Sequence, residues 1–270
     1  MNTRRISAIV GKELRELRSN PSAVLPVAIL VTLCLTVPFL TLVVIPKVTG
    51  DSLAADRTLR QIVERAAETS PRLSALSVET AVEAFMYQQF LLLFLVAPVV
   101  GAVSLAAYSV VGEKQGRTLE PLLATPLTTA ELLVAKVVAA FVPSMVIEVA
   151  GLFLYFGLVA LLASPGVPAV LVNARSLVLV CVVGPLGALA ALQTTIAVSS
   201  RVNDPRSAQQ IAVLVVVPLF VLTIGQIAGA FVLTVPVLLL IAAALAIAWM
   251  LLILLSMALF ERETILTRWK

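Results

Sequence analysis

The chain has 270 residues, of which 60% are hydrophobic and 13% are charged, and its formal net charge is +4. A soluble protein of this length could not bury so much apolar surface, so the composition excludes a soluble globular protein and indicates an integral membrane protein. The chain contains no histidine, which removes the commonest general base and the commonest transition-metal ligand. We therefore expect neither a catalytic site nor a metal site.

The first 22 residues predict an amphipathic helix at the membrane interface. Its apolar face consists of Ile6, Ile9, Val10, Leu14 and Leu17, and its opposite face of Arg4, Arg15 and Arg18. Glu13 falls on the apolar face, which weakens the pattern. Asn20 and Pro21 predict the end of this helix and a turn into the first apolar segment.

Six apolar windows follow, and each has the roughly 20 residues that a helix needs to cross a hydrocarbon core of about 30 Å. They are residues 23–45, 84–111, 132–163, 177–199, 211–233 and 235–260. The runs are continuous rather than alternating, so the spanning segments should be helices. We therefore predict an all-α polytopic membrane protein, with six transmembrane helices in a single transmembrane domain over residues 1–270.

Prolines and cysteines within the windows allow more detailed predictions about these segments and their connections. The third window is too long for one upright helix, which predicts either a tilt or a break near Pro143. The last two windows are joined around Thr234 and Pro236, which predicts a tight turn. Cys34 and Cys181 both fall inside windows, so we interpret them as small packing residues rather than as a disulfide or a metal pair.

The Lys and Arg residues predict the orientation of the chain. With the N-terminus in the cytoplasm, the inner segments carry thirteen of the 19 basic residues and the outer segments carry six. Because inner loops are enriched in Lys and Arg, both termini should be cytoplasmic. The basic residues lie along the flanks of the windows rather than in one patch with aromatic residues, so nucleic acid is not an expected partner.

The outer loop over residues 47–83 is the longest segment outside the windows. Apolar residues recur in it at helical spacing, namely Leu59, Ile62, Val63, Ala66 and Ala67. Charged residues flank them, including Arg57, Arg60, Glu64, Arg65 and Glu68. We expect a short amphipathic helix that rests on the outer face of the membrane or on a partner.

A charged insert separates the second and third windows. No charged residue occurs from residue 84 to residue 112, and Glu148 is the only one from residue 137 to residue 172. Between them lies EKQGRTLEPLLATPLTTAELLVAK, with a break at Pro126 and with Thr128 and Thr129 as candidate helix caps ahead of Glu131. The chain therefore leaves the membrane near Glu113, folds briefly in water and returns.

These features resemble the ABC-2 type permease family, the membrane subunits of a class of ATP-binding-cassette transporters. The charged loop carries the match through Glu113, Lys114, Gly116, Thr118, Leu119, Glu120, Leu122, Pro126, Glu131 and Lys136. Lys12, Glu13, Leu14 and the pair Asn20–Pro21 are similar to the family's elbow helix. Ala135 departs from the glycine that usually precedes the closing lysine of the loop.

The resemblance implies an exporter in the plasma membrane. Two membrane subunits, either two copies of this chain or one copy and a homologous permease, would pair among the membrane lipids and be driven by two ABC ATPase subunits. ATP and Mg would belong to those ATPases. The sequence of this chain agrees, because it contains no G-x-x-x-x-G-K-[ST] phosphate loop and so carries no nucleotide cofactor of its own.

The resemblance also assigns a coupling role to the first inner loop over residues 113–131, which would rest on the ATPase. Its coupling residues would be Glu113, Lys114, Arg117, Thr118, Glu120, Pro126 and Glu131. The second inner loop would add a smaller contact through Arg201 and Arg206. The alternative is that both loops are solvated connectors between helices.

A few polar residues lie within the windows and are candidates for a translocation path. Ser144, Glu148, Gly151 and Tyr155 share one helical face, which predicts a polar stripe that faces the bundle or a dimer interface. Glu148 could contact substrate or carry a proton, or it could form an interhelical hydrogen bond. Gln193 and Gln226 have the same two interpretations.

Two other functions remain as alternatives to a permease. A scaffold that does not transport could pass ATPase motion to an extracellular partner through the outer loop. An intramembrane lipid-modifying enzyme is disfavoured, because the windows contain no histidine, no clustered carboxylates and no visible pair of nucleophile and base.

Overall fold

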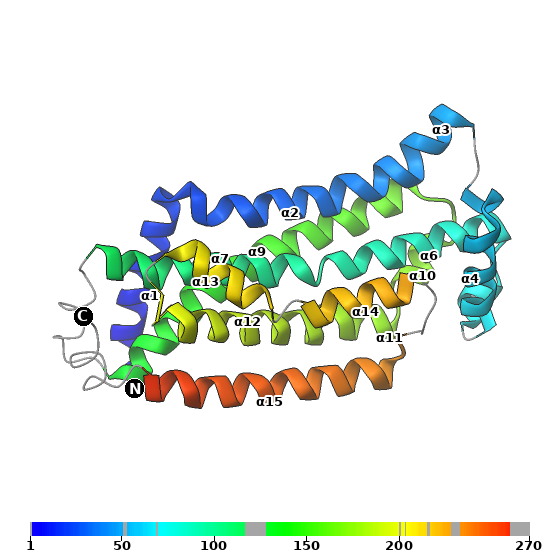
Figure 1. Cartoon of the computed structure of the whole chain (residues 1–270). Helices are drawn as coiled ribbons and strands as arrows, with labels where there is room; N and C mark the ends of the chain where they lie inside the picture. The colour runs from blue at the N-terminus through cyan, green and yellow to red at the C-terminus, as the bar shows by residue number, and fades with distance from the viewer. Residues whose placement is uncertain are drawn as a thin grey trace.

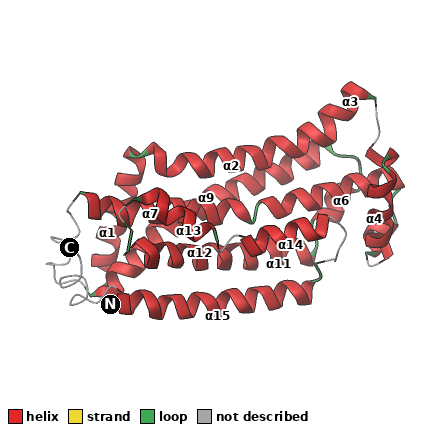
Figure 2. Cartoon of the chain, viewed as in Figure 1, coloured by secondary structure: helices red, strands yellow, loops and turns green. Residues whose placement is uncertain are grey.

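The computed structural model describes residues 2–50, 53–68, 70–116, 128–199, 201–202, 204–214, 217–227 and 233–259. Helices account for nearly all of these residues and none of them lies in a strand, which confirms the predicted all-α fold (Figure 2). The long helices run alongside one another in one elongated bundle (Figure 1). Helix α1 (Thr3–Ser19) lies across one end and α4 (Arg57–Glu68) lies at the other, and we refer to these as the α1 end and the α4 end.

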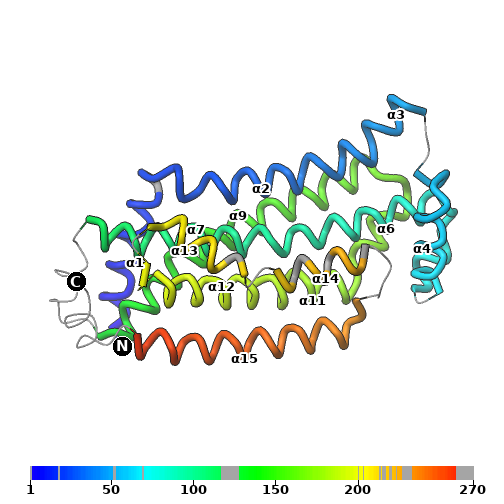
Figure 3. Tube along the Cα trace, viewed as in Figure 1, coloured from blue at the N-terminus to red at the C-terminus, as the bar shows by residue number. Residues whose placement is uncertain are grey.

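Five helical segments are long and apolar enough to cross a membrane, namely Pro21–Thr49, Val78–Gln115, Thr129–Leu162, Ala174–Ser199 and Val235–Leu259. They coincide with the first, second, third, fourth and sixth predicted windows. Helix α1 ends at Ser19 and the next helix begins at Pro21, as the Asn20–Pro21 pair predicts. The chain passes from one end of the bundle to the other along each of these segments (Figure 3).

Three of the five segments are divided into shorter helices. The first consists of α2 (Pro21–Phe39), the π-helical turn η1 (Leu40–Val44) and α3 (Ile45–Thr49). The second consists of α6 (Val78–Leu93) and α7 (Val96–Gln115), and the fourth of α11 (Ala174–Val178), the π-helical turn η3 (Leu179–Val183) and α12 (Gly184–Ser199). The turn η1 follows Pro38, which cannot donate a backbone hydrogen bond and disturbs the regular helix.

The fifth predicted window differs from the structure. It corresponds to two helices, α13 (Pro205–Val213) and α14 (Val217–Ile227), rather than to one continuous helix. The backbone N–H of Leu214 bonds to the carbonyl of Ile211, which tightens and closes α13. Pro218 then stands in the first turn of α14, where its missing N–H is tolerated.

The third window forms a single helix, α9 (Thr129–Leu162), of 34 residues. It continues through Pro143, so of the two expected alternatives the break does not occur and the tilt stays a prediction. At 1.5 Å per residue the helix is about 51 Å long, well beyond a hydrocarbon core of about 30 Å. The extra length carries Glu131 and Lys136 to the α1 end.

Helices α6 and α7 form the centre of the bundle. In the most apolar part of the segment Val78–Gln115, 83% of residues are buried, compared with 11% in α15 (Val235–Leu259). Helix α2 packs closely on α7 and on α9, because a Cβ atom on Gly101 of α7 would lie 3.1 Å from Val27 Cγ2 and one on Gly151 of α9 only 2.8 Å from Val31 Cγ1. Large apolar side chains on the outward faces of α9 and α15 stay uncovered by this chain, as Phe153 and Leu240 show.

Helix α4 is the predicted amphipathic helix of the outer loop. Asp56 caps its start by accepting hydrogen bonds from the N–H groups of Thr58 and Leu59. Its apolar face packs within the chain, on η2 (Leu53–Ala55), α5 (Pro71–Ser74) and α6, and Val63 is buried there. The apolar face of α4 therefore has packing partners within the chain, and its contact with the membrane or with a partner protein stays a prediction. A short helix, α10 (Val167–Leu171), completes the α4 end beside α6.

Candidate functional site: a charge cluster beneath the first inner loop

Four charged side chains meet inside the α1 end, where α1, α7 and α9 pack together. The Lys136 ammonium lies 2.7 Å from Glu113 Oε2 and 3.0 Å from Glu13 Oε1. The Lys12 ammonium lies 2.7 Å from Glu113 Oε1. The Lys136 ammonium also donates a hydrogen bond to the Ser109 hydroxyl at 3.0 Å. We refer to Lys12, Glu13, Glu113 and Lys136 as the charge cluster.

The charge cluster is buried and electrically balanced. The side chains of Lys136 and Glu13 are each 1% exposed and that of Glu113 is 3% exposed, whereas Lys12 reaches water. Burial alone would lower the pKa of Lys12, but the hydrogen bond and charge of Glu113 outweigh it and raise that pKa. Two positive and two negative charges compensate one another, which is the condition under which buried charges are tolerated.

A second set of contacts fixes the start of α9. Glu131 and Thr128 form a capping box, in which the Thr128 hydroxyl accepts from the Glu131 N–H at 3.2 Å and Glu131 Oε2 accepts from the Thr128 N–H at 3.1 Å. This confirms Thr128 as the predicted cap. Glu131 also accepts a hydrogen bond from the N–H of Asn2 at 2.7 Å and lies 3.9 Å from the guanidinium of Arg5. These contacts hold α1 against the first turn of α9, in addition to the ion pairs that α1 forms in the charge cluster.

These contacts surround both ends of the first inner loop. Helix α7 ends at Gln115 and α9 begins at Thr129, so the loop emerges between two helices that α1 joins together. Four predicted coupling residues lie outside the described residues, namely Arg117, Thr118, Glu120 and Pro126. Glu113 and Glu131 were expected to face a partner, but both are buried and their carboxylates point to contacts within the chain.

The second inner loop lies beside the first. The Lys114 ammonium donates a hydrogen bond to the carbonyl of Val202 at 3.2 Å. Asp204 caps α13 by accepting from the N–H of Ser207 at 3.0 Å. Arg201 and Arg206, the predicted coupling residues of this loop, are both exposed. One surface at the α1 end can therefore present both loops.

The predicted polar stripe on α9 faces the inside of the bundle. Ser144, Glu148 and Tyr155 are 0%, 6% and 0% exposed. The Tyr155 hydroxyl donates a hydrogen bond to the carbonyl of Tyr87 at 2.7 Å, and the Ser144 hydroxyl bonds to the carbonyl of Ala140 in its own helix. No described residue forms a hydrogen bond or an ion pair with the carboxyl group of Glu148, whose Oε2 is buried.

The two predicted glutamines lie on other helices. Gln193 of α12 is 1% exposed, and its Oε1 has no hydrogen-bond donor among the described residues. Gln226 of α14 donates from Nε2 to Oε1 of Gln89 in α6 at 2.8 Å. Gln226 also lines a cavity at the α4 end, whereas Ser144, Glu148, Tyr155 and Gln193 do not line that cavity. The structure therefore does not gather the five predicted path residues in one place.

Sequence reasoning missed the charge cluster itself. The sequence position of Glu13 could have indicated the cluster, since a carboxylate on the apolar face of an amphipathic helix needs a buried partner. Lys136 gave a second signal, because it lies inside the third apolar window. Their pairing across 123 positions of sequence could not be read from spacing. The Ser109 hydroxyl, which bonds to Lys136, gave no signal.

A comparison with known protein families gives evidence on the identity of the chain that does not depend on the structure. The family model described as ABC-2 family transporter protein matches residues 7–266, which is almost the whole chain. No curated protein matches the chain.

Proposed function

Because the chain belongs to the ABC-2 transporter family, we propose that it is the membrane permease subunit of an ABC exporter, driven by separate ATPase subunits. The exporter would contain two permease subunits, either two copies of this chain or one copy with a homologous permease, and two ATPase subunits that hold ATP and Mg. The match over residues 7–266 is the observation that carries this proposal. The absence of a phosphate loop from the sequence supports the separate ATPase.

The charge cluster suggests how ATPase motion reaches the membrane helices. An ATPase that docks on the loop between α7 and α9 pushes on the ends of two helices that α1 binds together. Buried ion pairs resist separation strongly, because breaking one leaves an uncompensated charge away from water. We therefore propose that α1 and the adjoining ends of α7 and α9 move as one rigid body when the ATPase closes.

The orientation of the chain is part of the same proposal. The α1 end would face the cytoplasm, with both inner loops presented to the ATPase, and the α4 end would face the outside. The excess of Lys and Arg in the inner segments supports this orientation. The lipids of the plasma membrane and the second permease subunit would then cover the apolar faces of α9 and α15.

A scaffold that transmits motion without transport is a second candidate. The segment Val78–Gln115 favours it, because this buried segment runs from the loop at the α1 end to the α4 end, where α4 packs on it. Movement at the loop can therefore reach the outer helix directly. Transport in liposomes separates the two candidates, since only a permease moves substrate across a sealed membrane.

Copurification tests the coupling role of the loop. Glu120→Lys should leave the chain inserted and monodisperse but detach the ATPase, because it places like charges together at the docking surface. Glu64→Lys is the matched control, since Glu64 is exposed on α4 at the other end of the bundle and lies outside the loop. Retention of a fully active ATPase by the Glu120 variant would mean that the loop is only a connector.

A further inference from the structure

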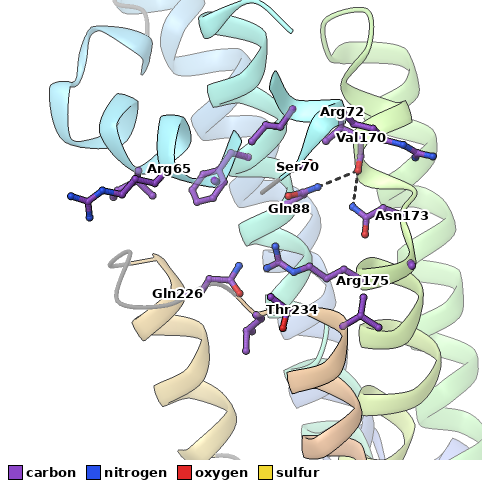
Figure 4. A pocket seen from close by; sticks show the side chains of 16 residues that line it. Arg65, Ser70, Arg72, Gln88, Val170, Asn173, Arg175, Gln226 and Thr234 are labelled. Carbon is purple, nitrogen blue, oxygen red and sulfur yellow. Dashed lines mark hydrogen bonds between the residues drawn. The ribbon is translucent and has the colours of Figure 1, made fainter. Parts of the chain in front are cut away.

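A cavity of about 380 Å³ opens at the α4 end, far from the loops that the proposed function uses. It is bounded by α4, α5 and α6 on one side, by α11 on another, and by α14 and the start of α15 on a third (Figure 4). Its wall combines apolar side chains, among them Ile62, Leu73, Phe85 and Leu233, with polar and basic ones. It therefore offers both an apolar surface and a charged one to a single ligand.

The charge of the cavity wall is of one sign. Arg65, Arg72 and Arg175 line it, and no described lining residue is acidic. The predicted outer segments contain six acidic and six basic residues in total, so the described acidic residues are excluded from the cavity wall while half of the basic ones line it. Within the part of the chain that the structure describes, no ion pair joins any of the three arginines to a carboxylate. The cavity is therefore suited to an anion.

Arg175 is the arginine that best fits an anchoring role. It is half-buried on α11, and Figure 4 shows its side chain extending across the cavity toward the side where Gln226 lies. Its guanidinium forms no hydrogen bond or ion pair with a described residue, whereas its backbone carbonyl accepts from the N–H of Leu179. Arg72, in contrast, donates to the carbonyls of Ala169 and Val172 at 3.1 and 3.0 Å, and Arg65 is exposed at the rim. A guanidinium partly withdrawn from water without a partner gains most from a bound anion.

Two further features of the wall point to a polar ligand. Gln226 is 3% exposed, and its Oε1 has no hydrogen-bond donor among the described residues, so a hydroxyl of a ligand can supply one. Helix α15 starts at Val235, and both Thr234 and Val235 line the cavity, so the positive end of a 25-residue helix dipole faces it. Both features add to the guanidinium of Arg175 rather than opposing it.

We propose that this cavity binds the phosphate group of an amphipathic molecule. The planar guanidinium of Arg175 matches two phosphate oxygens at once, which an ammonium group cannot do. The apolar side chains would contact the hydrocarbon part of the same molecule. A membrane phospholipid and a free organic phosphate share this chemistry. The site is independent of the proposed function, because it needs neither the ATPase nor the inner loops.

Binding of short-chain lipids to the purified full chain tests the proposal. The probes are dihexanoyl phosphatidic acid, dihexanoylglycerol, which differs only by lacking the phosphate, and inorganic phosphate. Native mass spectrometry or a thermal-shift titration in uncharged detergent gives the affinities. We expect phosphatidic acid to bind saturably and at least about tenfold more tightly than dihexanoylglycerol, as charge-assisted hydrogen bonds imply.

Variants locate the site. Arg175→Gln should weaken phosphatidic acid binding by about tenfold or more, and Arg175→Lys should give an intermediate loss because it keeps the charge but not the paired hydrogen bonds. Arg60→Gln is the matched control, since Arg60 is an exposed arginine of α4 that does not line the cavity, and it should change binding by less than about twofold. If inorganic phosphate alone competes with phosphatidic acid for the site, the ligand is a free phosphate compound. If inorganic phosphate does not compete, the ligand is a lipid.

Two results would overturn the proposal. One is equal binding of phosphatidic acid and dihexanoylglycerol, which would mean that the phosphate is not recognised. The other is wild-type affinity in the Arg175→Gln variant. If that variant does not fold, the comparison of the two lipids on the wild-type protein still decides the first question, and Arg175→Lys decides the second.

Discussion

Lys136 lies inside the bundle with its ammonium group between two carboxylates, and its burial makes it the most sensitive position of the charge cluster. Lys136→Met should lower the free energy of unfolding by about 3 to 5 kcal/mol, because it leaves a buried carboxylate without its partner. Glu64→Gln is the control and should change stability by less than about 0.5 kcal/mol, since Glu64 is exposed on α4, far from the charge cluster. Unfolding in mixed micelles measures both.

A double variant separates pairing from packing. Glu13→Leu combined with Lys136→Met removes one charge of each sign and leaves the Lys12–Glu113 pair at 2.7 Å intact. The double variant should therefore be less destabilised than the sum of the two single variants. If the effects simply add, the cluster is held by packing rather than by charge.

Glu148 differs from the charge cluster, because its carboxyl group is buried without a described partner. If it had a role as interhelical glue, its removal would destabilise the bundle. We instead expect Glu148→Leu to keep or raise the stability of the isolated chain, since it removes an unsatisfied buried carboxyl group. A loss of more than about 2 kcal/mol in the unfolding assay would reveal a partner that Glu148 has in solution. Transport by the Glu148→Gln variant then tests a role in substrate or proton binding.

At the scale of helices, the sequence is a good guide wherever one local property decides the outcome. Apolar length alone predicts the five segments that are long enough to cross a membrane, and periodicity alone predicts α4. The break between α13 and α14 was missed, because Pro218 was not weighed as the start of a new helix. The charge cluster could not be predicted, since its members come from α1, α7 and α9 and meet only after these helices pack.

The contact between α2 and α9 gives a test at this scale. Gly151→Val should destabilise the bundle by about 1 to 3 kcal/mol, because a Cβ there would already lie 2.8 Å from Val31 Cγ1. Gly157→Ala is the matched control in the same helix, where nothing lies within 4 Å of the added Cβ. It should be neutral or slightly stabilising, because alanine favours a helix over glycine. Equal effects of the two changes would contradict this packing.

For the whole molecule, the orientation of the bundle decides whether the two ends have the roles proposed. Single cysteines in a background without Cys34 and Cys181 can be labelled in intact cells with an impermeant reagent. A cysteine at Ser74, which is exposed near α4, should react from outside, and one at Gln115, which is exposed at the end of α7, only after the membrane is opened. The reverse pattern would place the α1 end outside and remove the docking surface for the ATPase.

The central claim is that this chain is the membrane half of a machine whose ATPase is another protein. ATP binding and hydrolysis should therefore be measured on the purified chain alone and on the complex isolated from its native membranes. We predict that the chain alone neither binds nor hydrolyses ATP, because its sequence contains no phosphate loop. The complex should contain an ABC ATPase and hydrolyse ATP. Binding of ATP at micromolar concentration by the chain alone, or a native complex without an ATPase, would contradict this account.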